Sequence, residues 1–217
     1  EKFNSGEKII DFISNTLNIE ISQKVRDYIS DELNSNLIYD ILGALKSDTS
    51  FFYIEADEES PSLRQFIDFA KSMGAITAYP YLGDIEQSVT GDKKAQKFED
   101  DFLEPLLKDL KEVGIDAIAF MPTRNTEKQL IRLMDKCKEY EFFQISGEDI
   151  NSPRQKFECP MLQNPLYSHL IQSTWALIGH EKAATKDVSG GMFTQKTIKN
   201  HPDLTERIKI FADIGRS

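Results

Sequence analysis

From residue 49 onward, short apolar runs alternate with segments of helical periodicity, and this alternation constrains the fold more than any other feature. Four runs have the length and composition of buried strands: residues 51–54, 75–79, 117–121 and 142–146. Amphipathic segments separate them, and Gly74 and Gly114 stand where two of these segments should end. Strand and helix in regular alternation predict a parallel sheet with right-handed crossovers.

Residues 1–48 contain only helical periodicity. Apolar residues recur at helical spacing in three places, and Ser22 is a plausible N-cap for the second. We expect three short helices that form a subdomain or cap. Such a subdomain either packs as scaffold or gates a site and binds a partner, and the pattern alone leaves both open.

After the fourth apolar run, residues 142–146, the alternation of strand and helix signals is weaker. Asn164 and Pro165 should begin a helix, and residues 194–210 should form another. Residues 176–181 fit either a last strand or a helix end. We therefore expect residues 49–217 to combine a partial parallel sheet with helices.

The chain has 217 residues, a net charge of −10 and an isoelectric point near 4.9. This acidity argues against a general nucleic-acid or anionic-membrane binder. The two cysteines, Cys137 and Cys159, form no spaced cluster, which argues against a disulfide framework or a zinc site and favours a reducing cytoplasm. We find no apolar run of the roughly 20 residues that a membrane-spanning helix needs.

Polar residues follow the predicted strands and should meet at one edge of the sheet, because parallel strands end together. We assign Glu148 and Asp149 as candidate metal ligands and Asn151 as a candidate catalytic residue. Candidate substrate-binding residues are Tyr79, Asp84, Arg124, Asn125 and Arg154. Carboxylates suit a hard divalent cation and arginines suit a phosphate group. The combination predicts metal-assisted hydrolysis of a phosphate ester.

His180 follows an apolar run and precedes Glu181. It could reach the same edge as a ligand or an acid/base, and we assign it as a candidate catalytic residue. The alternative is an ordinary residue at a helix end.

Three stretches resemble the PHP (polymerase and histidinol phosphatase) domain family. Residues 74–80 resemble its Ala-His-Pro strand, and Gly114 to Pro122 resemble its Ile-Glu and Tyr-His-Pro strand. Ser-Gly-Glu-Asp-Ile-Asn, residues 146–151, resembles its closing Gly-Ser-Asp-Phe-His, and residues 127–140 match the helix between. Asp149 keeps the family's aspartate. Other residues stand at the family's remaining ligand positions: Tyr79, Ala119, Met121 and Asn151.

The resemblance covers roughly residues 50–155 and implies an α/β fold, part of a distorted (β/α)7 barrel. Residues 49–217 would be its C-terminal part, and residues 1–48 would be a helical insertion. An upstream strand would carry the family's first His-X-His motif, so we expect a fragment of a longer barrel whose open edges permit homo-oligomers.

The family's activity implies a metal-dependent phosphoesterase that acts on a small phosphorylated molecule. The divalent metal would be Zn, Mn, Mg or Fe. Because histidines are missing from the matched motifs, two alternatives stay open. One is a PHP-like module without catalytic metals that binds an anionic ligand, and the other is a scaffold that docks a protein through the helical cap.

Overall fold

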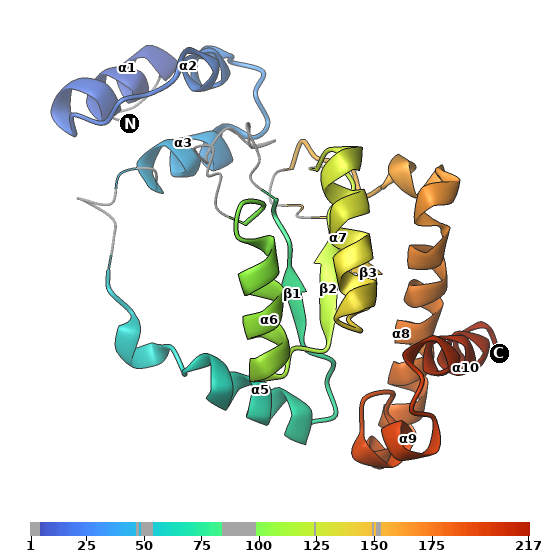
Figure 1. Ribbon diagram of the computed structural model, residues 1–217. Helices are drawn as coiled ribbons and strands as arrows, with labels where there is room; N and C mark the ends of the chain where they lie inside the picture. The colour runs from blue at the N-terminus through green and yellow to red at the C-terminus, as the bar shows by residue number, and fades with distance from the viewer. Residues whose placement is uncertain are drawn as a thin grey trace. The chain divides into compact units, whose positions relative to one another are not determined.

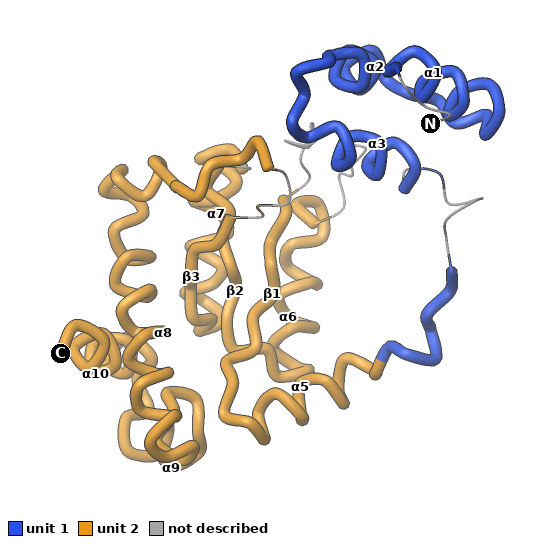
Figure 2. The backbone as a smooth tube through the Cα atoms, turned by 180° about the vertical axis from the view of Figure 1, so that it is seen from behind, with its two compact units in different colours: residues 1–60 blue, residues 61–217 orange. Residues whose placement is uncertain are grey.

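The computed structural model describes residues 5–46, 48, 54–83, 99–123, 125–148, 150 and 153–217. The chain forms two compact units, residues 1–60 and 61–217, which are coloured separately in Figure 2. The division lies further along the chain than the expected boundary after residue 48.

The first unit consists of short helices around its own apolar cluster. Its elements are α1 (Gly6–Asp11), the π-helical turn η1 (Phe12–Thr16), α2 (Gln23–Ser30), α3 (Leu37–Lys46) and the 3-10 turn η2 (Asp57–Glu59). Ser22 caps α2 as predicted, since its side chain accepts a hydrogen bond from the Val25 N–H. The buried residues that hold the helices together are Ile13, Ile19, Ile21, Ile29 and Ala44.

The second unit combines a small sheet with several longer helices. Its first part contains α5 (Leu63–Ser72), β1 (Ala78–Pro80), α6 (Leu103–Val113), β2 (Ala117–Phe120), α7 (Glu127–Glu139) and β3 (Phe143–Ser146). Its second part contains η3 (Pro160–Gln163), η4 (Pro165–Tyr167), α8 (Ser168–Lys186), η5 (Val188–Gly190), α9 (Gln195–Asn200) and α10 (Leu204–Arg216).

The three strands pair in the order β1-β2-β3, and both pairings are parallel. The ladder continues past the strand ends, because the Tyr81 N–H donates to the Ala119 carbonyl at 3.0 Å and the Gly147 N–H to the Phe120 carbonyl at 2.8 Å. The loops that follow all three strands therefore leave the sheet at the same edge. We call it the carboxyl edge.

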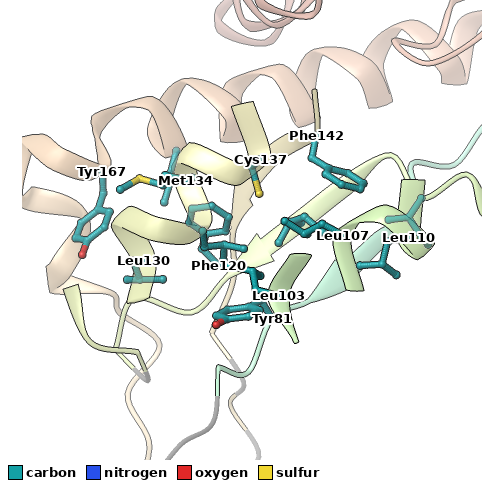
Figure 3. Close-up of a cluster of buried hydrophobic side chains, with 14 of the residues drawn as sticks. Tyr81, Leu103, Leu107, Leu110, Phe120, Leu130, Met134, Cys137, Phe142 and Tyr167 are labelled. Carbon is teal, nitrogen blue, oxygen red and sulfur yellow. The ribbon is translucent and has the colours of Figure 1, made fainter. Parts of the chain in front are cut away.

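Helices cover both faces of the sheet, and neighbouring residues of β2 point to opposite faces. Ile118 and Phe120 belong to a buried cluster with α6 and α7, which lie over one face in Figure 1. Figure 3 shows this cluster from close by. Ala117 and Phe143 belong to a second cluster, which α8 and α10 complete.

Helices α8 and α10 cross in close backbone contact at two glycines, one on each helix. A Cβ atom on Gly179 would overlap the Phe211 carbonyl, and one on Gly215 would overlap the Trp175 carbonyl. The backbones can approach this closely only because both positions lack a side chain.

The expectation of a partial (β/α)7 barrel is wrong. Within the described residues the fold is mainly helical, and the sheet is a small open one of three strands. The expected first strand, residues 51–54, lies outside the described residues except for the exposed Ile54. Residues 176–181, a possible last strand, lie inside α8. After β3 the chain packs helix on helix, which ends the strand–helix alternation that a barrel requires.

Candidate functional site

The turn after β1 is fixed by side chains of other segments. Asn125 donates its Nδ2 to the Leu82 carbonyl at 2.9 Å, and Gln129 donates its Nε2 to the Gly83 carbonyl at 2.8 Å. Gly83 has φ +62°, and a Cβ there would overlap the Asn125 amide, so the turn requires glycine. On the other side of the turn, the Leu82 and Gly83 N–H groups both donate to Glu99 Oε2 at 2.7 Å.

Two tyrosines at the end of β1 donate to the acidic pair Glu99 and Asp100. The Tyr79 hydroxyl lies 2.5 Å from Glu99 Oε1, and the Tyr81 hydroxyl lies 2.9 Å from Asp100 Oδ1. Arg132 of α7 also pairs with Asp100. Burial, followed by the bonded carboxylates, raises the pKa of both tyrosines, so their phenols remain protonated donors at neutral pH.

The loops after β2 and β3 are joined by a hydrogen bond from the Thr123 hydroxyl to Glu148 Oε2. The other carboxylate oxygen, Glu148 Oε1, is buried and has no hydrogen-bond partner among the residues that the structure describes. The same holds for Asn125 Oδ1, whose amide nitrogen is used by Leu82. Two oxygen acceptors at the carboxyl edge are thus withdrawn from water without a donor, an arrangement that normally needs a ligand, an ion or a water molecule.

Cys159 and Tyr167 lie on the chain that returns from β3 to α8. Burial, and then the neighbouring Glu148 carboxylate, raises the pKa of the Cys159 thiol to about 11. Tyr167 is fully buried in the first cluster, where Figure 3 shows its ring, and its hydroxyl has no partner within the described part of the chain. Cys159 is therefore a neutral thiol at physiological pH and does not supply a thiolate.

Some of the predicted site residues lie at the carboxyl edge, and others lie outside the described residues. Asp84, Arg124, Asp149 and Asn151 lie outside the described residues. The structure brings Tyr79, Asn125 and Glu148 to the carboxyl edge, where each has the contacts given above. Arg154 lies in an exposed turn after β3.

The structure does not bring His180 to this edge. Its Nδ1 accepts a hydrogen bond from the Met192 N–H at 2.9 Å, and its ring also bonds the backbone of Gly74, which precedes β1. Burial lowers the pKa of His180. Both hydrogen bonds connect α8 to segments near the amino end of the sheet. A neutral imidazole ring can make both bonds, in agreement with the lowered pKa.

Sequence reasoning missed five residues that shape the carboxyl edge, namely Glu99, Thr123, Gln129, Cys159 and Tyr167. Gln129 did carry a signal, because Thr126 and Gln129 have the spacing of a capping box, and the structure contains that box at the start of α7. No sequence signal marked Glu99, since an acidic residue in a polar stretch is usually a solvated charge.

Among the described residues there is no group of three or more His, Cys, Asp or Glu side chains arranged to hold a metal ion. None of the described helices is long and apolar enough to cross a membrane. Comparison with models of known protein families, with curated proteins and with solved structures finds no match to this chain.

Proposed function

We propose that the carboxyl edge of the sheet binds a divalent cation and a phosphate ester and hydrolyses that ester. The observation that carries the proposal is the pair of buried acceptor oxygens, Glu148 Oε1 and Asn125 Oδ1, which have no donor among the described residues. A carboxylate and an amide oxygen are ligands that hard cations such as Mg²⁺ or Mn²⁺ accept. Burying them unpaired costs stability, and a bound cation would remove that cost.

In this proposal Glu148 is the main ligand and Asn125 a secondary one. Thr123 positions the Glu148 carboxylate through its hydroxyl, as the outer partners of metal ligands commonly do. When bound, the cation would offset the charge of the ester and stabilise the charge that develops in the transition state. Arg124 and Arg154 are assigned to the phosphate group, and Asp149 is assigned to the metal, from their positions in the same loops.

The resemblance to PHP domains supports the same reaction class. The first two stretches contain β1 and β2, the third begins at the last residue of β3, and the three strands are parallel neighbours. Asp149, which keeps the family's aspartate, directly follows Glu148. We therefore propose a divergent relative of these phosphoesterases. His180 receives no role in this proposal, because its ring nitrogens are engaged at the other end of the sheet.

Cys159 is not proposed as a nucleophile. Burial and the neighbouring Glu148 together raise its pKa to about 11, which leaves the thiol almost entirely protonated at neutral pH. The attacking group in this proposal is water.

The test is hydrolysis of p-nitrophenyl phosphate by the purified chain with added Mn²⁺ or Mg²⁺, compared with EDTA-treated protein. We expect metal-dependent turnover that Glu148→Gln and Asp149→Ala reduce by at least about tenfold. Glu158→Gln is the matched control, since Glu158 is exposed and pairs with Lys156. Equal turnover in Glu148→Gln and the control would contradict the proposal. Metal-free protein that binds phosphate without turnover would favour the anionic-ligand module instead.

A further inference from the structure

Three hydrogen-bond donors at the end of β1 converge on one carboxylate. The Leu82 and Gly83 N–H groups each lie 2.7 Å from Glu99 Oε2, and the Tyr79 hydroxyl lies 2.5 Å from Glu99 Oε1. Two successive backbone N–H groups that point at one oxygen form a nest, the backbone arrangement that proteins use to bind anions. In this protein the bound anion is a side chain of the same chain.

The donors are held in place without help from Glu99. The Leu82 carbonyl, which shares a peptide plane with the Gly83 N–H, accepts from Asn125, and Gln129 holds the Gly83 carbonyl that follows. The Leu82 N–H directly follows Tyr81, which is fully buried and donates its own N–H to the Ala119 carbonyl of β2. Tyr79 packs against the first buried cluster, which fixes its ring. The turn would therefore keep its shape if the carboxylate were withdrawn.

Glu99 reaches the nest from a separately anchored stretch. Its neighbour Asp100 is held by the Tyr81 hydroxyl at 2.9 Å and by an ion pair with Arg132. The anchor at Asp100 does not depend on the bonds that Glu99 makes. The Glu99 side chain can thus leave the nest without releasing the chain that carries it.

From this geometry we propose that the Leu82 and Gly83 N–H groups and the Tyr79 hydroxyl form an oxoanion subsite, and that Glu99 occupies it as an internal competitor. The ligand would carry a carboxylate or a phosphate group, because either offers two oxygens to the same three donors. An external anion cannot bind while Glu99 fills the nest. The apparent affinity for that anion is therefore its intrinsic affinity multiplied by the fraction of molecules in which the nest is empty.

The inference goes beyond the proposed function and does not depend on it. It involves no metal and none of the bonds of Glu148. The nest nevertheless adjoins the hydrolytic site that we propose. Asn125 holds the turn with its Nδ2, and its Oδ1 at the carboxyl edge has no hydrogen-bond partner among the described residues.

The test is an NMR titration of the ¹⁵N-labelled chain with sodium phosphate and, separately, sodium acetate, at constant ionic strength against chloride. The Leu82 and Gly83 amide signals are followed in the unmodified protein and in Glu99→Ala and Glu99→Gln. Glu104→Ala is the control, because it removes a carboxylate that bonds Lys136 and Tyr140 instead of the nest.

We expect Glu99→Ala to bind one of the two anions at least about tenfold more tightly than the unmodified protein does, with Glu99→Gln between them. Glu104→Ala should match the unmodified protein. Tighter binding of phosphate would identify a phosphate ester as the ligand class, and tighter binding of acetate a carboxylate.

Absence of a saturable amide shift in Glu99→Ala, or equal affinity in Glu99→Ala and the unmodified protein, would overturn the inference. If Glu99→Ala folds only in the presence of an oxoanion, that result supports it. If this variant fails to fold in every buffer, Glu99→Gln decides, and affinity no higher than that of the unmodified protein would refute the subsite. Failure of the metal site would leave these amide shifts unchanged, so the two proposals are tested separately.

Discussion

Thr123 and Glu148, 25 residues apart in the sequence, are joined by a hydrogen bond from the threonine hydroxyl to the glutamate carboxylate. The bond links the loop after β2 to the loop after β3 and leaves Glu148 Oε1 as the oxygen without a partner among the described residues. The orientation of Glu148 at the carboxyl edge therefore depends on a side chain from another loop.

Replacing Thr123 by Val should weaken Mn²⁺ binding by about tenfold, because a ligand that loses its outer hydrogen bond is no longer held in one orientation. Thr123 is exposed, so the free energy of unfolding should change little. Titration calorimetry measures the affinity, and Thr123→Ser, which keeps the hydroxyl, should restore it. Equal affinity in the Val and Ser variants would show that the bond does not position Glu148.

The alkylation rate of Cys159 should report its contact with Glu148. Burial and then Glu148 raise the thiol pKa to about 11, so iodoacetamide should react slowly at neutral pH. Glu148→Gln should speed the reaction by roughly threefold or more at a pH of about 8, because removing the carboxylate's charge favours the thiolate. Mass spectrometry locates the label on Cys159. A rate equal to that of Glu158→Gln would contradict the contact.

Substituting Gly179 by Ala should destabilise the second unit by about 3 kcal/mol, because the added methyl group overlaps the Phe211 carbonyl at the crossing of α8 and α10. Gly190→Ala is the control, since the nearest atom to its added Cβ would be the Ala183 carbonyl oxygen at 3.7 Å. Urea unfolding measures both variants. A loss in Gly179→Ala no larger than in Gly190→Ala would contradict the close crossing.

The free energy of unfolding should fall between pH of about 7.5 and about 5.5. Burial lowers the pKa of His169 and of His180 below the ordinary value of 6.5. As pH drops through 6.5, the unfolded chain therefore takes up protons that the folded chain does not, and unfolding becomes more favourable. Urea titrations at the two pH values measure the effect.

His169→Gln should reduce this pH dependence, because it removes one titrating group while an amide can still donate to Gln144 Oε1, which His169 Nε2 contacts at 3.0 Å. Equal or greater stability at the lower pH in the unmodified protein would contradict the assignment of neutral, buried histidines.

Local features of the fold could be predicted from the sequence because their signals lie within a few residues. Gly74 and Gly114 both have positive φ and follow α5 and α6 where those helices were expected to end. Thr126 caps α7, and β2 and β3 fall on predicted apolar runs. These elements depend on periodicity and caps, which are local properties of a chain.

The closure of the sheet and the details of the site were not predictable in the same way. Whether strands form a barrel depends on pairings between distant segments, and the apolar periodicity of residues 176–181 fits a strand as well as the interior of α8. Glu99 bonds Gly83 across 16 residues, and no local pattern distinguishes it from its acidic neighbours. His180 was a candidate for the carboxyl edge, with an ordinary residue at a helix end as the alternative, but its position is set by Met192 and Gly74.

The central claim is that Glu148 holds a divalent cation at the carboxyl edge, and direct measurement of Mn²⁺ binding by titration calorimetry tests it. We predict saturable binding to the unmodified chain and to Glu158→Gln, with affinity at least about tenfold lower in Glu148→Gln. No saturable binding to the unmodified chain, or the same affinity in Glu148→Gln, would contradict the account.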